Sequence, residues 1–166
     1  MAFHGWATSS RFVAYTRTRH RPPARRGGEP RDQVQRLHRE VRRGAFHGYG
    51  SESGGDVEGF ARDKGYVATC LPSRKVGEDR VVFGEGDDEV VLDIVTGRHL
   101  GWRLSRGDKV LATHTFQDIY VDVEADLYPS PDGRQAILVM HLDKGWVVDA
   151  AVYPVWLGPP PPKRPR

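Results

Sequence analysis

Cysteine and long apolar runs are both scarce in this chain, and each scarcity excludes a class of protein. The single cysteine, Cys70, rules out an internal disulfide and any zinc site built from several cysteines. No apolar run approaches the roughly 18 residues that a membrane-spanning helix needs, and residues 1–10 lack the basic start and apolar core of a signal peptide. We therefore expect a leaderless soluble protein with no membrane span, or a domain of a longer protein, in an unknown compartment.

Several common catalytic and cofactor motifs are missing as well. Neither a P-loop nor a dinucleotide-binding fingerprint occurs in the sequence. The seven histidines include no pair at the spacing that places two metal ligands on one helix. Cys70 stands at the end of an expected strand, where a cysteine is more often a small buried apolar residue than a nucleophile. Nothing in the sequence points to a Ser-His-Asp site either.

Lysine is absent from residues 1–50, which carry eleven arginines against three acidic residues, a net charge of +8. Residues 51–158 carry eleven basic and nineteen acidic side chains, a net charge of −8, and the last residues add three basic ones. A basic arm is thus joined to an acidic body. Because a guanidinium grips phosphate bidentately, an arm rich in arginine suits anion contact. The candidate anions are nucleic acid, a phosphorylated cofactor and the acidic body itself.

The basic arm contains the first expected strand. Residues 11–16 are β-branched and aromatic in content, and the segment continues into Arg17, Arg19 and Arg21. Alternate positions of a strand share a face, so we expect these three arginines on the same side. Pro22 ends the strand.

One helix is expected near the N-terminus, over residues 32–43. Its apolar residues recur at positions i, i+3 and i+7, as on one face of a helix. They are Val34, Leu37 and Val41. The glycine-rich residues 45–59 that follow are expected to form a loop or the wall of a cleft.

From residue 65 onward, short β-rich segments follow at regular intervals, separated by turn signals such as Pro-Asp-Gly. The sequence therefore predicts an α+β fold that is mainly β: a split antiparallel β-sandwich body with one helix near the N-terminus. The expected strands are 65–70, 80–84, 89–96, 100–104, 109–114, 118–128, 135–142 and 146–155.

The domain organisation is expected to be simple. Residues 1–158 would form a single globular domain, within which residues 1–30 are the basic arm with the first strand. Residues 159–166 are rich in proline and basic residues, so we expect an extended tail.

Three segments, read together, resemble the mono-ADP-ribosyltransferase toxins of the cholera and pertussis type. Arg17 stands four residues before Arg21-Pro22-Pro23, residues 40–50 follow as a glycine-rich stretch, and residues 63–70 read Asp-Lys-Gly-Tyr-Val-Ala-Thr-Cys. The resemblance covers roughly residues 13–127. It implies a domain that binds NAD as its substrate and transfers ADP-ribose to an unknown protein or nucleic-acid acceptor.

The resemblance also implies a role for particular residues. Arg17 would hold the NAD phosphates, Tyr66 or Tyr49 would stack on nicotinamide, and Thr69 would orient the catalytic carboxylate. Asp108 would be that carboxylate, because breaking the nicotinamide glycosidic bond builds positive charge on the ribose, which a nearby carboxylate stabilises.

The chain departs from the family pattern at its catalytic motifs. Ala68 and Cys70 replace two serines of the Ser-Thr-Ser strand, and Asp108 stands where the family has Glu. The shorter side chain misses the position of a Glu carboxylate by about 1.5 Å, and displacement on that scale can lower a rate by about two orders of magnitude. The resemblance therefore implies NAD binding with transfer that is weak or lost.

Two further hypotheses come from the residues themselves. The first is a non-catalytic β-rich module that binds nucleic acid or an acidic partner through its arginine-rich arm. The second is a metal-dependent nucleotide phosphatase, because residues 118–126 alternate acidic and apolar side chains and so place several carboxylates on one strand face. An ordinary solvated strand face, with Arg or Lys across from it, explains the same pattern.

Overall fold

The computed structural model describes residues 1–21, 31–52, 55–95, 101–116, 120, 122–145 and 148–159, with the backbone alone at 19–21, 31–33 and 49–52. The chain divides into two compact units. Unit 1 comprises residues 1–42 and 46–68, and unit 2 comprises residues 43–45 and 69–166. The expected single domain over 1–158 stays a prediction, and the expected tail lies outside the described residues from 160 onward.

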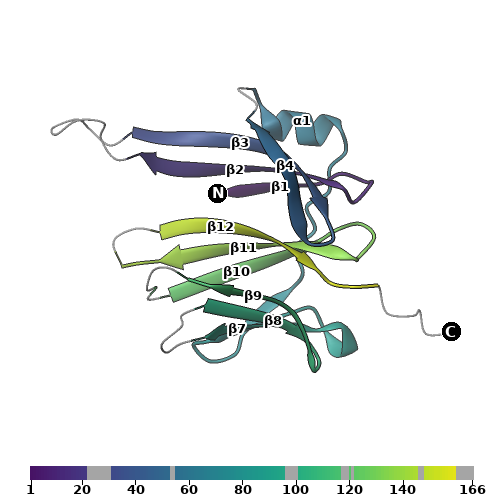
Figure 1. Cartoon of the computed structure of the whole chain (residues 1–166), viewed down its shortest axis with the longest axis vertical. Coiled ribbons are helices and arrows are strands. Elements are labelled where there is room, and N and C mark those ends of the chain that lie inside the picture. Colours follow the sequence, from purple (N-terminus) through teal and green to yellow (C-terminus); the bar gives the residue numbers. More distant parts are fainter. Residues whose placement is uncertain are drawn as a thin grey trace. The chain divides into compact units, whose positions relative to one another are not determined.

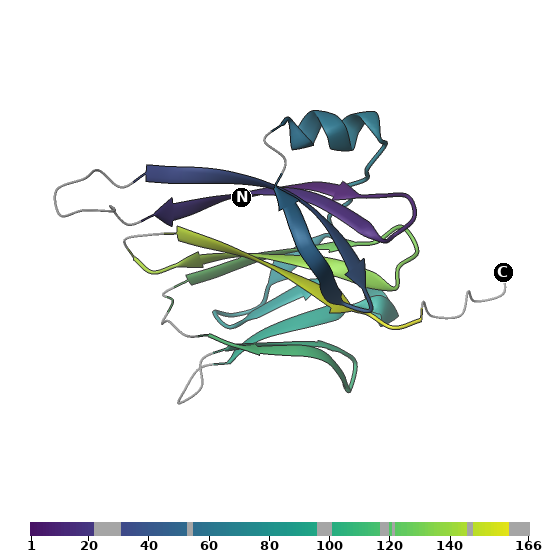
Figure 2. The same ribbon diagram turned by 45° about the horizontal axis from the view of Figure 1, so that its top comes forward.

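Unit 1 holds a four-stranded sheet in the order β1-β2-β3-β4 and one α-helix, α1 (Figure 1). The helix lies across one face of this sheet (Figure 2). The elements are β1 (Ala2–Trp6), β2 (Phe12–Arg21), β3 (Arg31–Arg42), β4 (Ala45–Glu52) and α1 (Val57–Asp63).

The expected helix over residues 32–43 is wrong, because this segment is the strand β3. It pairs with β2 in ten consecutive antiparallel pairs, from Phe12 opposite Glu40 to Arg21 opposite Arg31. The helical interpretation rested on Val34, Leu37 and Val41. The strand instead buries Gln35, Leu37 and Val41, which share one of its faces. Val34 is 51% exposed. Pairing with β2 thus overrides a local pattern that is compatible with a helix.

The helix that does form, α1, begins inside the stretch that was expected to be a loop. Its first turn is capped by Asp56, whose carboxylate accepts a hydrogen bond of 2.9 Å from the Gly59 N–H. Val57 and Ala61 are buried against Ala14 of β2. Residues 45–52 form the strand β4, so a loop over 45–59 is wrong for β4 and for the start of α1, whereas residues 53 and 54 lie outside the described residues and the alternative of a cleft wall stays a prediction.

Unit 2 is a two-sheet body, as expected from its regular strand pattern. One sheet has the order β5-β6-β7-β8-β9 and the other β10-β11-β12, and every described pairing is antiparallel. The strands are β5 (Ser73–Lys75), β6 (Arg80–Phe83), β7 (Val90–Val95), β8 (Gly101–Arg106), β9 (Lys109–Thr115), β10 (Asp122–Pro129), β11 (Gln135–Asp143) and β12 (Val148–Trp156).

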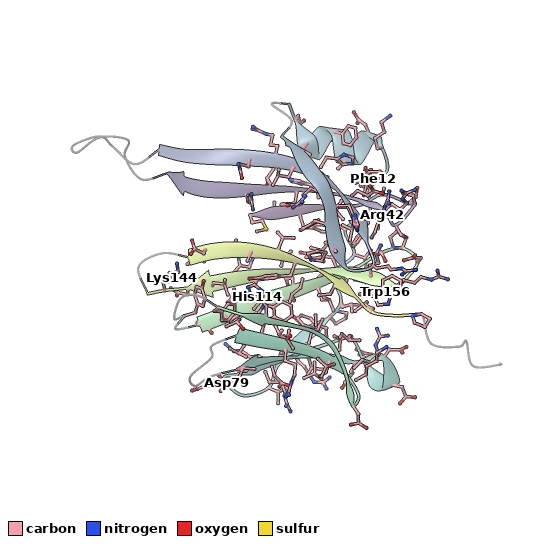
Figure 3. The ribbon with its side chains drawn as sticks, viewed as in Figure 1. Phe12, Arg42, Asp79, His114, Lys144 and Trp156 are labelled. Atoms are coloured by element: carbon pink, nitrogen blue, oxygen red, sulfur yellow. The ribbon has the colours of Figure 1, made fainter. Side chains whose placement is uncertain are left out.

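A single apolar core joins the two sheets of unit 2. It contains Phe83, Leu92 and Leu104 from the first sheet and Leu127 and Leu138 from the second, all fully buried. Figure 3 shows side chains filling the space between the two sheets of unit 2. The mainly-β α+β fold is therefore confirmed. Among the described residues, no helix has the length and apolar content to span a membrane.

The expected strand over residues 65–70 reduces to one bridge. Val67 and Trp6 exchange two backbone hydrogen bonds of 2.8 Å each. This crossing requires glycine at position 5, where φ is +129° and an added Cβ would lie 2.8 Å from the Val67 backbone. Gly5 also sits at the point where the register of β1 on β2 shifts.

We predict that Gly5→Ala destabilises unit 1 by about 1–3 kcal/mol, because the new methyl group collides with Val67 and the backbone conformation is unfavourable for any other residue. Urea unfolding would measure the loss. Gly65→Ala is the matched control, since Gly65 also has a positive φ (+68°) but an added Cβ there meets nothing within 4 Å. Equal losses in the two variants would show that the crossing of Val67 contributes nothing.

Candidate functional site

Positive charge is concentrated in unit 1. This unit carries twelve Arg and Lys residues against seven Asp and Glu, a net charge of +5, whereas unit 2 carries thirteen against fifteen, a net charge of −2. The distal half of the β2–β3 hairpin, which we call the ribbon, consists of residues 16–21 and 31–36. It holds five arginines and one acidic residue, Asp32. The ribbon is therefore the most basic part of the described sheet.

The ribbon projects past its neighbour on the β1 side. The β1 ladder ends at the pair Ala2–Thr16, whereas the β2–β3 ladder continues for five more pairs to Arg21 opposite Arg31. In Figure 1, β2 and β3 run side by side to their common end. Arg19 stands opposite Gln33. The arginines expected on one face thus occupy alternate positions of a regular two-stranded ladder, as the sequence predicted.

The Arg17 side chain is hydrogen-bonded to a residue of the neighbouring strand. Its Nε donates a hydrogen bond of 2.8 Å to Oε1 of Gln35, the residue directly across the ladder. Gln35 is buried and Arg17 is half-buried. Because a guanidinium has five N–H donors, this bond fixes the plane of the group while using one of them. Sequence reasoning missed Gln35, because the helix expected over 32–43 gave it no partner on β2.

Nearer the β3–β4 turn, the arginines have local partners. Arg11 and Arg42 both bind the Glu40 carboxylate, at 2.6 and 2.7 Å. These hydrogen bonds hold the pKa of Glu40 below its ordinary value. Arg39 lies over the Phe46 ring, 4.2 Å from its centroid, and donates to the Gly48 carbonyl at 3.0 Å. The charge of this half of the hairpin is therefore partly neutralised by residues of the hairpin and its neighbours.

Tyr66, expected to stack on nicotinamide, belongs to an aromatic cluster on the α1 side of the sheet. Its hydroxyl lies 2.6 Å from His38 Nε2, and its ring contacts His38 and Phe60. Phe12 joins this cluster by stacking on His38. Burial raises the pKa of Tyr66 and lowers that of His38. The cluster fastens α1 to β2 and β3.

The residues expected to form an NAD site are distributed over both units. Arg17 and Tyr66 belong to unit 1, where they lie on opposite faces of the β2–β3 ladder, since Gln35 and His38 are three positions apart. Thr69 and Asp108 belong to unit 2 and are exposed, Asp108 in the β8–β9 turn. The side chain of Tyr49, in β4, lies outside the described residues. Neither unit by itself brings these residues together.

The acidic strand has the expected alternation over its described part, β10. Val123, Ala125 and Leu127 are buried, while the carboxylates between them lie on the other face. Lys75 binds Asp122 at 2.8 Å, and this bond lowers the pKa of Asp122. In the described part of the chain, no group of three or more His, Cys, Asp or Glu residues could hold a metal ion. The solvated strand face thus has its basic partner, whereas residues 118 and 119 lie outside the described range.

Cys70 is exposed, so the expectation of a buried residue is wrong. Its Sγ lies 3.7 Å from Oδ1 of Asp126. Partial burial, and then the negative charge of Asp126, raise the pKa of the thiol. A raised pKa lowers the thiolate fraction, and the thiolate is the reactive form. Cys70 therefore lacks the environment of a nucleophile.

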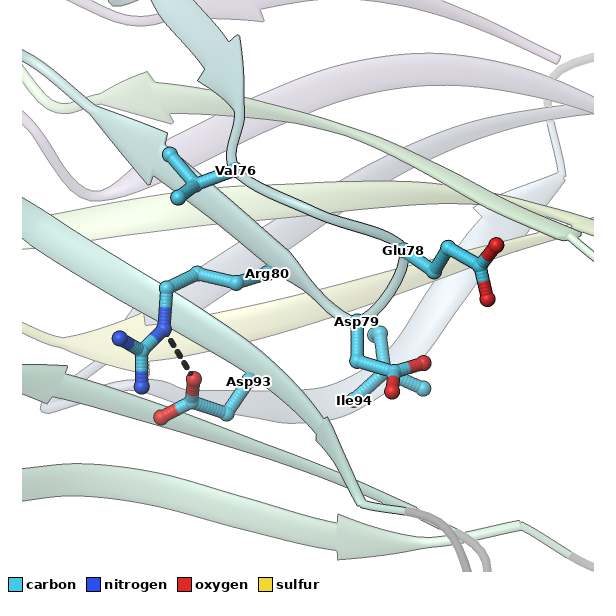
Figure 4. Close-up of a pocket in the computed structure, with 6 residues that line it drawn as sticks. All are labelled: Val76, Glu78, Asp79, Arg80, Asp93 and Ile94. Atoms are coloured by element: carbon cyan, nitrogen blue, oxygen red, sulfur yellow. Dashed lines mark hydrogen bonds and ion pairs between the residues drawn. The ribbon is translucent and has the colours of Figure 1, made fainter.

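Unit 2 has two further features that could take a ligand. One is a pocket of about 340 Å³ beside β6 and β7, where Arg80 binds Asp93 at 2.6 Å (Figure 4). Arg103 also binds Asp93, at 3.4 Å. The pocket is lined by Val76, Glu78, Asp79, Arg80, Asp93 and Ile94. The negative charge of Asp93 is thus compensated by Arg80 and Arg103.

The other feature is a series of ring contacts at the β9 edge. The ring centroids of Trp102 and Tyr153 lie 5.0 Å apart, and the His114 ring contacts both. Burial raises the pKa of Tyr153. Because Tyr153 also packs against the unit 2 core, this series closes the edge of the sandwich.

No protein-family model, curated protein or solved structure matches this chain. The resemblance to ADP-ribosyltransferase toxins therefore stays a prediction, and a function has to be argued from the residues described above.

Protonation of His38 should weaken unit 1. Because the folded-state pKa of His38 lies below its ordinary value, the unfolded chain binds more protons, and stability falls as pH drops through about 6.5 toward the folded-state pKa. We predict a smaller pH dependence of the unfolding free energy in His38→Gln between about pH 7.5 and 5.5. His47→Gln, which removes an exposed histidine of the same unit, is the control. Equal pH dependence in both variants would contradict the role of His38.

Nicotinamide release from NAD tests the ADP-ribosyltransferase prediction. If the resemblance holds, wild-type protein releases nicotinamide and Asp108→Ala lowers the rate by about a hundredfold or more, because the ribose loses its carboxylate. Glu85→Ala removes another exposed carboxylate of unit 2 and should leave the rate unchanged. Absence of release from the wild type, or equal release from both variants, would count against this reaction.

Proposed function

We propose that this protein binds nucleic acid through the arginine-rich ribbon formed by β2 and β3. The observation that carries the proposal is the placement of Arg17, Arg19 and Arg21 at alternate positions of a two-stranded ladder that extends beyond β1. The ribbon has five arginines against one acidic residue, and unit 1 as a whole is basic. Such a concentration of guanidinium groups is the electrostatic signature of polyanion binding.

The spacing of the ribbon arginines suits a phosphate backbone. Strand residues rise about 3.4 Å each, so alternate positions are about 6.8 Å apart. The phosphates of a nucleic-acid strand also recur at regular intervals, and because they wind around the helix axis a straight row of arginines meets them over a short stretch. Arginines at alternate positions can therefore contact phosphates within that stretch, where a guanidinium can hold a phosphate bidentately.

An acidic protein partner is a weaker match for the same ribbon. In the other half of the hairpin, Arg11 and Arg42 already bind a carboxylate of unit 1, that of Glu40. The arginines of the ribbon are spaced along its two strands and do not form a compact patch. A line of like charge is complementary to a regular polyanion, whose negative groups recur at fixed intervals.

Fluorescence anisotropy with labelled oligonucleotides would test the proposal. Replacing Arg17, Arg19 and Arg21 together by Gln should weaken binding at least tenfold and reduce the slope of log K against log salt by about 1.8 to 2.7, since two or three phosphate contacts are lost at about 0.9 each. The matched control replaces three exposed cations of unit 2 by Gln, namely Arg74, Lys109 and Arg134.

The control triple variant removes the same charge from the chain. It should retain most of the affinity and nearly the whole salt slope, because long-range attraction alone is largely screened at physiological salt. If the two triple variants lose equal affinity, binding reflects net charge and the ribbon has no special role. If the wild type does not bind any oligonucleotide at about 50 mM salt, where such contacts are strongest, the proposal is wrong.

A further inference from the structure

We infer that the ribbon reads the major groove of duplex DNA, with Arg17 directed at a guanine edge and Gln35 holding it in place. This inference rests on the proposed nucleic-acid binding and names the form of nucleic acid and the reading residue. It depends on three observations: the composition of the ribbon, the shape of a two-stranded ladder, and the bond between Arg17 and Gln35.

The composition of the ribbon disfavours single strands. Proteins that bind single-stranded nucleic acid place bases on aromatic side chains, which supply much of the affinity. Residues 16–21 read Thr-Arg-Thr-Arg-His-Arg and residues 31–36 read Arg-Asp-Gln-Val-Gln-Arg, with no Phe, Tyr or Trp. The described aromatic rings elsewhere on β2 and β3 are occupied: Phe12 packs in the His38 cluster, and Tyr15 stacks on Phe46. Apart from His20, the ribbon thus offers hydrogen-bonding groups rather than aromatic rings on which bases stack.

The shape of the ribbon favours DNA over duplex RNA. An antiparallel pair of strands fits the major groove of B-form DNA, which is about 12 Å wide. The major groove of A-form RNA is too deep and narrow for side chains to read. The β2–β3 ladder runs from Thr16 to Arg21 without a bulge and continues for five pairs beyond β1, so the end of this antiparallel pair has the regular geometry that a groove can accept.

The Arg17–Gln35 bond supplies orientation. Arginine reads guanine by donating two hydrogen bonds, to O6 and N7, and such a contact needs a fixed guanidinium plane. The 2.8 Å hydrogen bond from Arg17 Nε to the buried Gln35 holds the guanidinium in one plane. Gln35 is therefore a positioning residue, and Arg17 makes the base contact. The next pairs along the same face, Arg19 with Gln33 and Arg21 with Arg31, repeat the residue types suited to base edges and phosphates.

Arg36 provides a matched comparison on the same ribbon. It stands next to Gln35 on β3, opposite Thr16, and so belongs to the other face of the ladder. It carries the same charge as Arg17 and is also half-buried. An effect of net charge or of general phosphate contact would appear equally in both positions, whereas reading of a base would appear at Arg17 alone.

The first test compares three forms of one mixed sequence by anisotropy at equal salt: duplex DNA, single-stranded DNA and duplex RNA. We expect duplex DNA to bind at least tenfold more tightly than the other two. Equal binding of all three forms would overturn the inference while leaving the proposed function intact, because phosphate contact alone explains it. Preference for the single strand or for RNA would overturn it as well. If none binds, the proposed function and this inference both fail.

The second test isolates the guanine contact. Duplexes enriched from a random library by the wild-type protein are remade with 7-deazaguanine, which lacks the N7 acceptor but leaves the phosphates and base pairing in place. We expect the wild type to bind the modified duplex about tenfold more weakly, the lower range of a bidentate base contact. No change would overturn the inference. This comparison uses the unaltered protein, so it does not depend on whether a variant folds.

The variants then assign the contact. Arg17→Ala and Gln35→Ala should bind the normal and modified duplexes equally, whereas Arg36→Ala should keep the tenfold difference even if its overall affinity falls. Circular dichroism identifies any variant that has lost the fold. A difference that survives in folded Arg17→Ala would overturn the assignment of Arg17, and one that survives in folded Gln35→Ala would overturn the positioning role of Gln35.

Discussion

The antiparallel pairing of β2 with β3 is the constraint on which the rest of unit 1 depends. Its ten uninterrupted pairs fix one register, and because strand side chains alternate, register decides which face each residue occupies. In this register Leu37 and Val41 are buried, while His38, between them, meets Tyr66 on the α1 side. A slip by one residue would exchange these faces, removing the hydrogen bond that helps fasten the helix. The register that buries the core residues therefore also determines which face each ribbon arginine occupies.

Local sequence could not have identified β3, for a physical reason. Arg, Gln, Leu and Glu, which dominate residues 31–42, are good helix formers, whereas strand preference depends mainly on the neighbours that a strand acquires. Leu37 and Val41 fit a helical stripe and a strand face equally well. What decides between them is the length match with residues 12–21, which lie beyond a proline- and glycine-rich connection. That information is non-local, and the error hid Gln35 as the partner of Arg17.

Unit 2 was predictable because its signals are local. From β6 to β12, alternating or continuous apolar segments are separated by glycine turns, and seven of the expected strands occur within a few residues of their expected bounds. The strand expected over residues 65–70 does not form, because Tyr66 and Val67 each make a different tertiary contact. Tyr66 packs in an aromatic cluster and Val67 bridges to Trp6, so a β-prone composition reflects two tertiary contacts instead of a strand. The acidic alternation of β10 was confirmed, but its carboxylates face Lys75 and Cys70.

Arginine has two structural environments on the β2–β3 hairpin, and the difference bears on function. Near the β3–β4 turn, Glu40 is shared by Arg11 and Arg42, and Arg39 lies on Phe46. Exposed ion pairs of this kind add little stability, but they reduce repulsion between neighbouring cations. The ribbon sequence contains five arginines and one acidic residue, so it has an excess of like charge. Like charge at close spacing opposes folding, and a polyanion along the ribbon would offset it. A ligand that bound the folded ribbon more tightly than the unfolded chain would therefore also stabilise the hairpin.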